Sequence, residues 1–99
     1  MTPEQKVKAK IRSAFKARGI WYCTPVGGPY GNAGVPDFLA CVKGRMLGVE
    51  AKAERGRVTA LQAKCHSEIV KSGGGVLIVG PGDLADLDAT LDTMMGLGT

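Results

Sequence analysis

The 99-residue sequence predicts a single α/β domain in which a mixed β-sheet is flanked by helices. Thr-x-x-Gln capping boxes at Thr2 and Thr59 indicate two helix starts. Lys43-Gly44 has the form of a two-residue hairpin loop between two strand-like runs. A short apolar run at residues 76–79 follows the second helix, as a parallel strand follows a crossover helix. The predicted order of elements is therefore α-β-β-β-α-β-α.

The first helix is expected to begin after Thr2 and to end near Lys16 or Arg18, because Gly19 follows. Its apolar face consists of Val7, Ile11, Ala14 and Phe15. Glu4, the only acid of this helix, shares that face. Two interpretations stay open: a carboxylate that needs a partner in the interior, or a first-turn acid that favours the helix dipole.

A strand at residues 20–26 and a glycine-rich loop at residues 27–34 come next. The loop is either a plain connection or a segment that lets a phosphate backbone approach closely, with Tyr30 available for a sugar or a base. The GxxxxGK[ST] pattern is missing from it, which excludes a nucleotide-binding P-loop.

The hairpin predicts a cluster of charged side chains at one end of the sheet. If Val42 pairs with Arg45 across the turn, Asp37 lies directly opposite Glu50, with Cβ atoms roughly 4.5–5.5 Å apart. Lys52 points to the same face, because side chains alternate along a strand. Two close carboxylates repel each other in a dry site unless a cation lies between them. A hard divalent metal ion with oxygen ligands is therefore the expected partner of this cluster.

The remaining elements follow from shorter patterns. The opposite face of the second hairpin strand should meet the core, and Gly48 should leave open space beside Glu50. A helix is expected from Thr59 to about Ser72, with Gln62 and His66 on a face next to its core stripe. That stripe consists of Leu61, Cys65 and Ile69. The run at 76–79 predicts a strand covered on both faces. The final acidic helix has one apolar side, made of Leu84, Leu87, Leu91 and Met94.

Composition narrows the class of protein. The sequence lacks an apolar run of about 20 residues and a signal peptide, so we expect a cytoplasmic protein without membrane contact. Three cysteines favour buried free thiols over a disulfide framework. All 13 Lys and Arg precede residue 83, which indicates either a surface for nucleic acid or a solvated basic surface. The candidate nucleic-acid contacts are Lys6, Lys10, Tyr30, Arg55 and Arg57.

Pro36-Asp37 followed by Glu50-Ala51-Lys52 resembles the PD-(D/E)xK nuclease superfamily. The finer resemblance is to the VRR-NUC family, the virus-type replication-repair nucleases, and it covers about residues 2 to 80. It rests on Gly34-Val-Pro-Asp37, Val49-Glu-Ala-Lys52, Gln62 and the run Gly74 to Val79. The resemblance implies a restriction-endonuclease-like core, α-β-β-β-α-β, followed by a C-terminal helix.

The same resemblance implies a Mg²⁺- or Mn²⁺-dependent endonuclease acting on DNA in a bacterial or phage-infected cell. Asp37, Glu50 and the Ala51 carbonyl would be metal ligands, and Lys52 would position or activate the attacking water. Gln62 would lie beside the metal. Glu4 matches the acid of the family's first helix and would support the metal network. Short members of the family resemble junction-resolving homodimers, so a four-way DNA junction is the candidate substrate.

Other interpretations remain at this stage. The chain could be a non-catalytic basic protein that binds nucleic acid through its first helix, or a metal-binding structural subunit of a larger complex. Glu50 and Lys52 could form a surface ion pair across a solvated strand. Two facing carboxylates count against a pure binder, because they would repel a phosphate. The acidic helix after residue 82 could lie on the basic surface or form a dimer contact.

Overall fold

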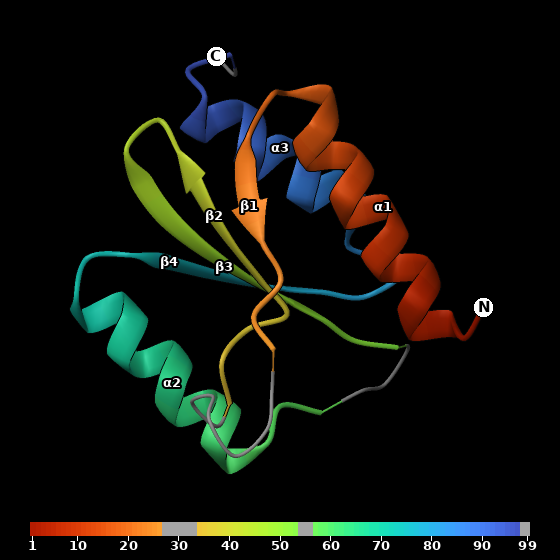
Figure 1. The fold of residues 1–99 in the computed structure, drawn as a ribbon, viewed down its shortest axis with the longest axis vertical. Coiled ribbons are helices and arrows are strands. Elements are labelled where there is room, and N and C mark those ends of the chain that lie inside the picture. The colour runs from red at the N-terminus through yellow and green to blue at the C-terminus, as the bar shows by residue number, and fades with distance from the viewer. Residues whose placement is uncertain (27–33, 54–56, 98–99) are drawn as a thin grey trace.

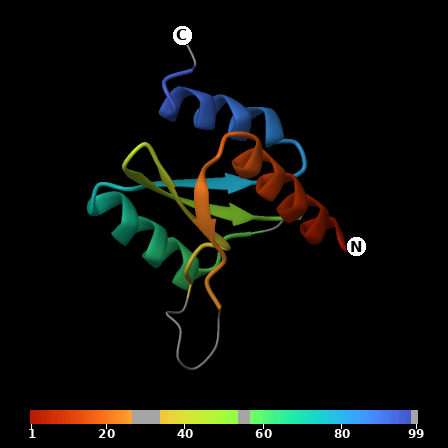
Figure 2. The ribbon, with the colours of Figure 1, turned by 45° about the horizontal axis from the view of Figure 1, so that its top comes forward.

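The computed structural model describes residues 1–26, 34–53 and 57–97. A four-stranded sheet has α1 and α3 on one face and α2 on the other (Figure 1). Figure 2 shows the same layers from a second direction. The elements are α1 (Pro3–Ala17), β1 (Trp21–Cys23), β2 (Phe38–Val42), β3 (Arg45–Ala51), α2 (Ala60–Lys71), β4 (Gly75–Val79) and α3 (Leu84–Met94). The predicted mixed α/β architecture is confirmed.

The sheet has the order β1-β2-β3-β4, antiparallel except for the parallel pair of β3 and β4. Val42 pairs with Arg45, as the hairpin prediction required, and the ladder continues to Phe38 opposite Val49. Lys43 and Gly44 both have positive φ, 51° and 82°, as a two-residue turn of type I′ needs. The next opposed pair beyond the ladder consists of the two carboxylates, Asp37 and Glu50.

Both predicted capping boxes are present. In α1, Thr2 Oγ1 accepts a 3.2 Å hydrogen bond from the Gln5 backbone nitrogen, and Gln5 Oε1 accepts a 2.9 Å bond from the Thr2 nitrogen. Thr59 and Gln62 repeat this arrangement at the start of α2. The caps satisfy backbone donors that the helix itself cannot satisfy, and each contributes about 1 kcal/mol.

The hydrophobic core lies between the sheet and the layer formed by α1 and α3. It includes the α1 stripe, the inward face of β3 and the apolar side of α3: Val7, Ile11, Phe15, Leu47, Val49, Ala51, Leu87 and Leu91. Arg18 joins the two helices through Asp92, at 2.8 Å, and Asp88, at 3.1 Å. The acidic helix therefore lies on the basic first helix, the first of its two expected placements.

The face of the sheet under α2 differs from the prediction. Within α2 no residue is fully buried, and Leu61, expected in the core, is 58% exposed. Gly48 does not border open space, because a Cβ there would lie 2.8 Å from the Pro36 side chain and 3.6 Å from Ile69. Ile69 also contacts Gly74 closely. Thus α2 packs against the sheet with the Ile69 side chain next to two glycines, Gly48 and Gly74. Much of the apolar surface of α2 remains exposed to water.

Two smaller expectations were also wrong. β4 is not covered on both faces, because Ile78 is 44% exposed, and the strand lies at the edge of the sheet. The three cysteines are free as expected, but Cys41 is exposed and the others are half-buried. In the described ranges, no helix is long and apolar enough to cross a membrane.

Candidate active site

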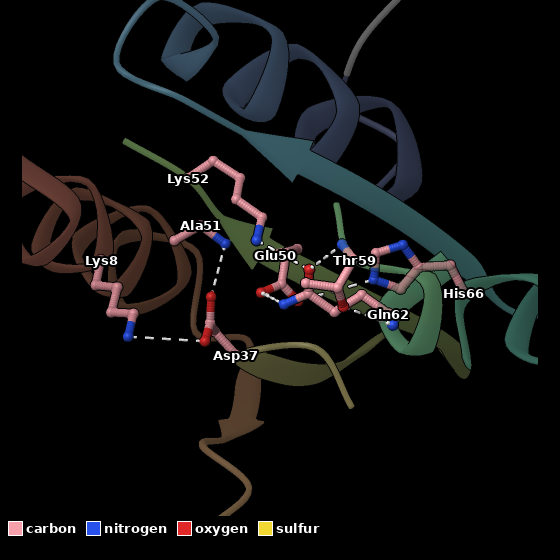
Figure 3. Close-up of polar contacts among 8 residues, drawn as sticks. All are labelled: Lys8, Asp37, Glu50, Ala51, Lys52, Thr59, Gln62 and His66. Atoms are coloured by element: carbon pink, nitrogen blue, oxygen red, sulfur yellow. Dashed lines mark hydrogen bonds and ion pairs between the residues drawn. The ribbon is translucent and has the colours of Figure 1, made fainter. Parts of the chain in front are cut away.

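Asp37 is fixed at the start of β2 by contacts on both carboxylate oxygens. Its Oδ2 accepts a 2.9 Å hydrogen bond from the backbone nitrogen of Ala51, and its Oδ1 lies 3.7 Å from Lys8 Nζ (Figure 3). The bond to Ala51 crosses from β2 to β3 beyond the last ladder pair. It holds Asp37 against the strand that carries Glu50, so the register places the carboxyls side by side.

Glu50 is the only buried charged residue among the described ones, with 2% of its surface exposed. Its pKa is raised to about 7, chiefly by burial and then by the charge and hydrogen bonding of Asp37, while the charge of Lys52 acts in the opposite direction. Glu50 Oε1 accepts a 3.2 Å bond from Gln62 Nε2. Glu50 Oε2 has no hydrogen-bond partner in the described part of the chain. The site thus holds a carboxylate whose negative charge is poorly compensated.

Gln62 connects this carboxylate to the lysine. Its Oε1 accepts 2.9 Å hydrogen bonds from Lys52 Nζ and from the Thr59 backbone nitrogen, and its Nε2 donates to Glu50 (Figure 3). The capping box fixes the side chain of Gln62, because the same oxygen closes the first turn of α2. The start of α2 therefore positions the Lys52 ammonium beside Glu50.

His66 lies one helical turn after Gln62 and approaches the other oxygen of Glu50. Its Nε2 is 3.7 Å from Glu50 Oε2, too far for a hydrogen bond, and within the described residues it has no hydrogen-bond partner. Burial lowers the pKa of His66, and the charge of Lys52 lowers it further, so both oppose protonation of the imidazole. The sequence placed His66 on the correct face, and its spacing of four from Gln62 was the only signal of a role.

The other predicted site residues are placed as follows. Glu4 is half-buried, and its charge contributes to the raised pKa of Glu50. Lys6 and Lys10 are exposed on α1, and Arg57 is exposed ahead of α2. Tyr30 and Arg55 fall outside the described residues. The contact of Lys8 with Asp37 was missed, although Lys8 follows Glu4 by one helical turn and so lies on the same side of α1.

The chemistry of this donor set fits a hard divalent cation. Two adjacent carboxyls, of which Glu50 has a suppressed ionisation and an unpartnered buried oxygen, are stabilised when a cation lies between them. In the described ranges, His, Cys, Asp and Glu side chains do not form a group of three that could hold a metal. A bound ion would therefore need oxygen ligands of other kinds, such as backbone carbonyls and water, and Mg²⁺ commonly keeps several waters.

Comparison with solved structures supports the mixed α/β fold described above. A solved structure titled "VRR_NUC domain" superposes on the chain with a TM-score of 0.71 over 97% of each chain, at 23% sequence identity. No family model matches the sequence, and no curated protein matches it. The similarity extends over the whole domain and includes the elements that carry the candidate site. The chain has the fold of a VRR_NUC domain, as the resemblance of its motifs predicted.

Proposed function

We propose that this protein is a metal-dependent, structure-selective DNA endonuclease. The observation that carries the proposal is the pair of buried Glu50 and half-buried Asp37, which lies next to the Lys52 ammonium in a domain with the VRR_NUC fold. A buried carboxyl with a pKa raised to about 7 is a common mark of a functional site. Burial of such a group costs stability, and proteins commonly carry this cost where the chemistry of a site requires it.

Asp37, Glu50 and the Ala51 carbonyl would hold Mg²⁺ or Mn²⁺. The bound cation would polarise the scissile phosphate and increase the acidity of water. Glu50 is held for this role by Gln62, and Asp37 by the Ala51 nitrogen, so both carboxylates are oriented before a ligand arrives. Glu4 would add negative potential to the site without a direct contact to Glu50.

Lys52 would position the attacking water and stabilise the negative charge that develops on the phosphate. Gln62 leaves this ammonium few alternative positions, because its oxygen accepts a 2.9 Å bond from Lys52 Nζ. Lys52 is half-buried, so its charge is screened less than that of a fully exposed lysine. In-line attack by water on the phosphodiester bond is the reaction that this arrangement supports.

The substrate would be chosen by DNA shape. The chain has a net charge of +4, and it carries exposed Lys6, Lys10 and Arg57 as proposed contacts to phosphates, together with Tyr30 and Arg55. A homodimer with two active sites would suit a symmetric four-way junction, where paired cuts are needed. We propose the junction as the preferred substrate and the cytoplasm as the location.

The proposal is tested by incubating the protein with a labelled four-way junction and with a matched linear duplex. Each DNA is combined with Mg²⁺, Mn²⁺ or EDTA, using wild type, Lys52→Ala and Lys71→Ala. Lys71 lies at the exposed end of α2, so its variant removes the same charge away from the site. We expect metal-dependent cutting of the junction by wild type and Lys71→Ala, and a loss of cutting in Lys52→Ala.

The other outcomes separate the parts of the proposal. Equal cutting of junction and duplex would retain the nuclease and remove the shape preference. Binding without cutting under either metal would favour the non-catalytic nucleic-acid-binding protein. A strong rise in melting temperature with Mg²⁺ but no turnover would favour a metal-binding structural subunit.

A further inference from the structure

Two basic residues on successive turns of α1 border the candidate active site. Lys8 Nζ lies 3.7 Å from Asp37 Oδ1, and Arg12 Cζ lies 5.4 Å from the centroid of the Phe38 ring. Because Asp37 and Phe38 are consecutive, the two cations form a row that begins at the candidate metal ligand and continues along the helix. Figure 3 shows the first of these contacts, with Lys8 reaching Asp37 from α1.

Both cations line an open, shallow groove of about 530 Å³ on the surface of α1. The residues that line it are Met1, Gln5, Lys8, Ala9 and Arg12. Among these lining residues the charged side chains are both cationic, and the amide of Gln5 can donate hydrogen bonds. Such a lining suits an extended polyanion, because ammonium and guanidinium groups about one helical turn apart can contact neighbouring phosphates.

The opposite side of α1 has a different electrostatic environment. Lys6 and Lys10 line a groove with Pro81 and Leu84 at the start of α3, and Lys10 also borders a groove that contains Asp88. The aspartates of α3 weaken the attraction of that side for a polyanion. The groove beside Lys8 and Arg12 is therefore the stronger candidate for a close phosphate contact.

We propose that the groove lined by Lys8 and Arg12 binds the phosphodiester backbone of the DNA strand next to the scissile bond. Lys8 pairs with Asp37 when no divalent cation is bound, and it turns to a phosphate when a cation takes that carboxylate. The inference rests on the proposed nuclease function and names the surface that holds its substrate.

The ion pair of Lys8 with Asp37 suits this exchange. Its separation of 3.7 Å is long, and the two side chains are 29% and 24% exposed. Partly solvated pairs of this kind contribute little to stability. A divalent cation at Asp37 therefore displaces Lys8 with little loss of stability. The released ammonium remains close to the site, because Lys8 stays on the turn of α1 that faces Asp37. Arg12, which has the Phe38 ring as its neighbour, is available in both states.

The experiment measures binding of a fluorescein-labelled linear duplex by anisotropy across a range of salt concentrations. All proteins carry Lys52→Ala to prevent cutting, and each is measured in Mg²⁺ and in EDTA. The variants are Lys8→Gln, Arg12→Gln and, for comparison at the exposed end of α2, Lys71→Gln. Arg12→Lys keeps the charge and controls for a packing effect at Phe38, and thermal melting checks that each variant is folded.

Arg12→Gln is expected to reduce the magnitude of the negative slope of log K against log[salt] by about 0.9 in both buffers, the value for one lost phosphate contact. Arg12→Lys should retain the wild-type slope. Lys8→Gln should lower the slope by a similar amount in Mg²⁺ but leave it unchanged in EDTA, where Lys8 is paired with Asp37. Equal losses for Lys8, Arg12 and Lys71 would show a general electrostatic field and would overturn the assigned groove.

Calorimetric titration of Mn²⁺ without DNA tests the exchange separately. Removal of the competing ammonium in Lys8→Gln should increase the affinity for Mn²⁺ by about threefold or more. An unchanged affinity would overturn the exchange. If wild type bound no Mn²⁺, the proposed metal-dependent function would fail, whereas the effect of Arg12→Gln in EDTA would still decide whether the groove binds DNA.

Discussion

Gln62 Nε2 donates a 3.2 Å hydrogen bond to Glu50 Oε1, and this contact joins the first turn of α2 to the buried carboxyl on β3. The same amide caps the helix through the Thr59 backbone nitrogen. Since α2 has no fully buried residue, its N-terminal end is positioned largely by this polar network. A change at Gln62 should therefore affect both the helix and the site.

The substitution Gln62→Glu separates these two effects. Glutamate also satisfies a capping box, so the helix start should be retained, but its carboxylate oxygen replaces the donor that faces Glu50. In EDTA at pH 8 we expect a lower melting temperature than wild type, and a larger recovery on addition of Mn²⁺. Gln62→Ala loses the cap as well and should recover less. Identical melting of Gln62→Glu and wild type in EDTA would argue that the amide does not support Glu50.

Glu50 should make the metal-free protein less stable as the pH rises. Its pKa of about 7 in the folded state lies above its ordinary value of 4.5, so the folded protein keeps a proton that the unfolded chain has released. The contribution of this proton is fully present below pH 4.5 and is lost as the pH rises through 7. The loss is of the order of 3 kcal/mol, at about 1.4 kcal/mol per pH unit.

Urea unfolding in EDTA at pH 5.5 and pH 8 measures this effect. The wild type should lose stability between the two values, and Glu50→Gln should lose much less, because its amide does not titrate. The lowered pKa of His66 acts in the opposite direction, since the unfolded imidazole takes up a proton below about pH 6.5, and both proteins share it. Parallel profiles for the two proteins would contradict a raised pKa at Glu50.

Gly34 should tolerate substitution poorly because α2 lies directly against it. Its φ is 80°, and an added Cβ would overlap the Leu61 carbonyl oxygen and lie 2.8 Å from the Gln62 nitrogen. Gly44 has nearly the same φ, 82°, but a Cβ there would meet no described atom within 4 Å. We expect Gly44→Ala to cost about 1 kcal/mol of backbone strain and Gly34→Ala more than about 2 kcal/mol. Comparable losses in urea unfolding would refute the close approach.

The contact between α1 and α3 should depend more on Asp92 than on Asp88. The Arg18 guanidinium lies 2.8 Å from Asp92 and 3.1 Å from Asp88, and Asp88 is the more exposed of the two, at 56% against 41%. Asp92→Asn should lower the melting temperature by about 4–8 °C, which corresponds to about 1 kcal/mol in a domain of this size. Asp88→Asn should change it by less than half as much. A larger fall in melting temperature for Asp88→Asn than for Asp92→Asn would show that the more exposed ion pair, Arg18 with Asp88, contributes more to the contact between the helices.

Local chemistry explains which features could be predicted from the sequence. The capping boxes at Thr2 and Thr59 need only residues three positions apart, and the Lys43-Gly44 turn sets the register of its own strands. That register brought Asp37 and Glu50 together without any knowledge of the remaining fold.

Features that depend on contacts between distant elements could not be predicted in this way. Gly48 was assigned open space, because nothing local shows that Pro36 and Ile69 fill it. Leu61 fits an apolar helical stripe, yet α2 contacts the sheet through Ile69 and leaves Leu61 exposed. Lys8 is one of many lysines on α1, and only the packing of the helix against β2 distinguishes it as the partner of Asp37.

Single-turnover cleavage of a labelled four-way junction with saturating Mn²⁺ tests the central claim most directly, using wild type and Asp37→Asn. The amide of the variant keeps the shape of the carboxyl but loses the charge that would bind the cation. The account predicts a fall in rate of at least about 100-fold. DNA binding in EDTA should be retained or strengthened, because the amide of Asp37→Asn no longer pairs with the Lys8 ammonium. Cleavage by Asp37→Asn at the wild-type rate would contradict the assignment of Asp37 and Glu50 as the metal site.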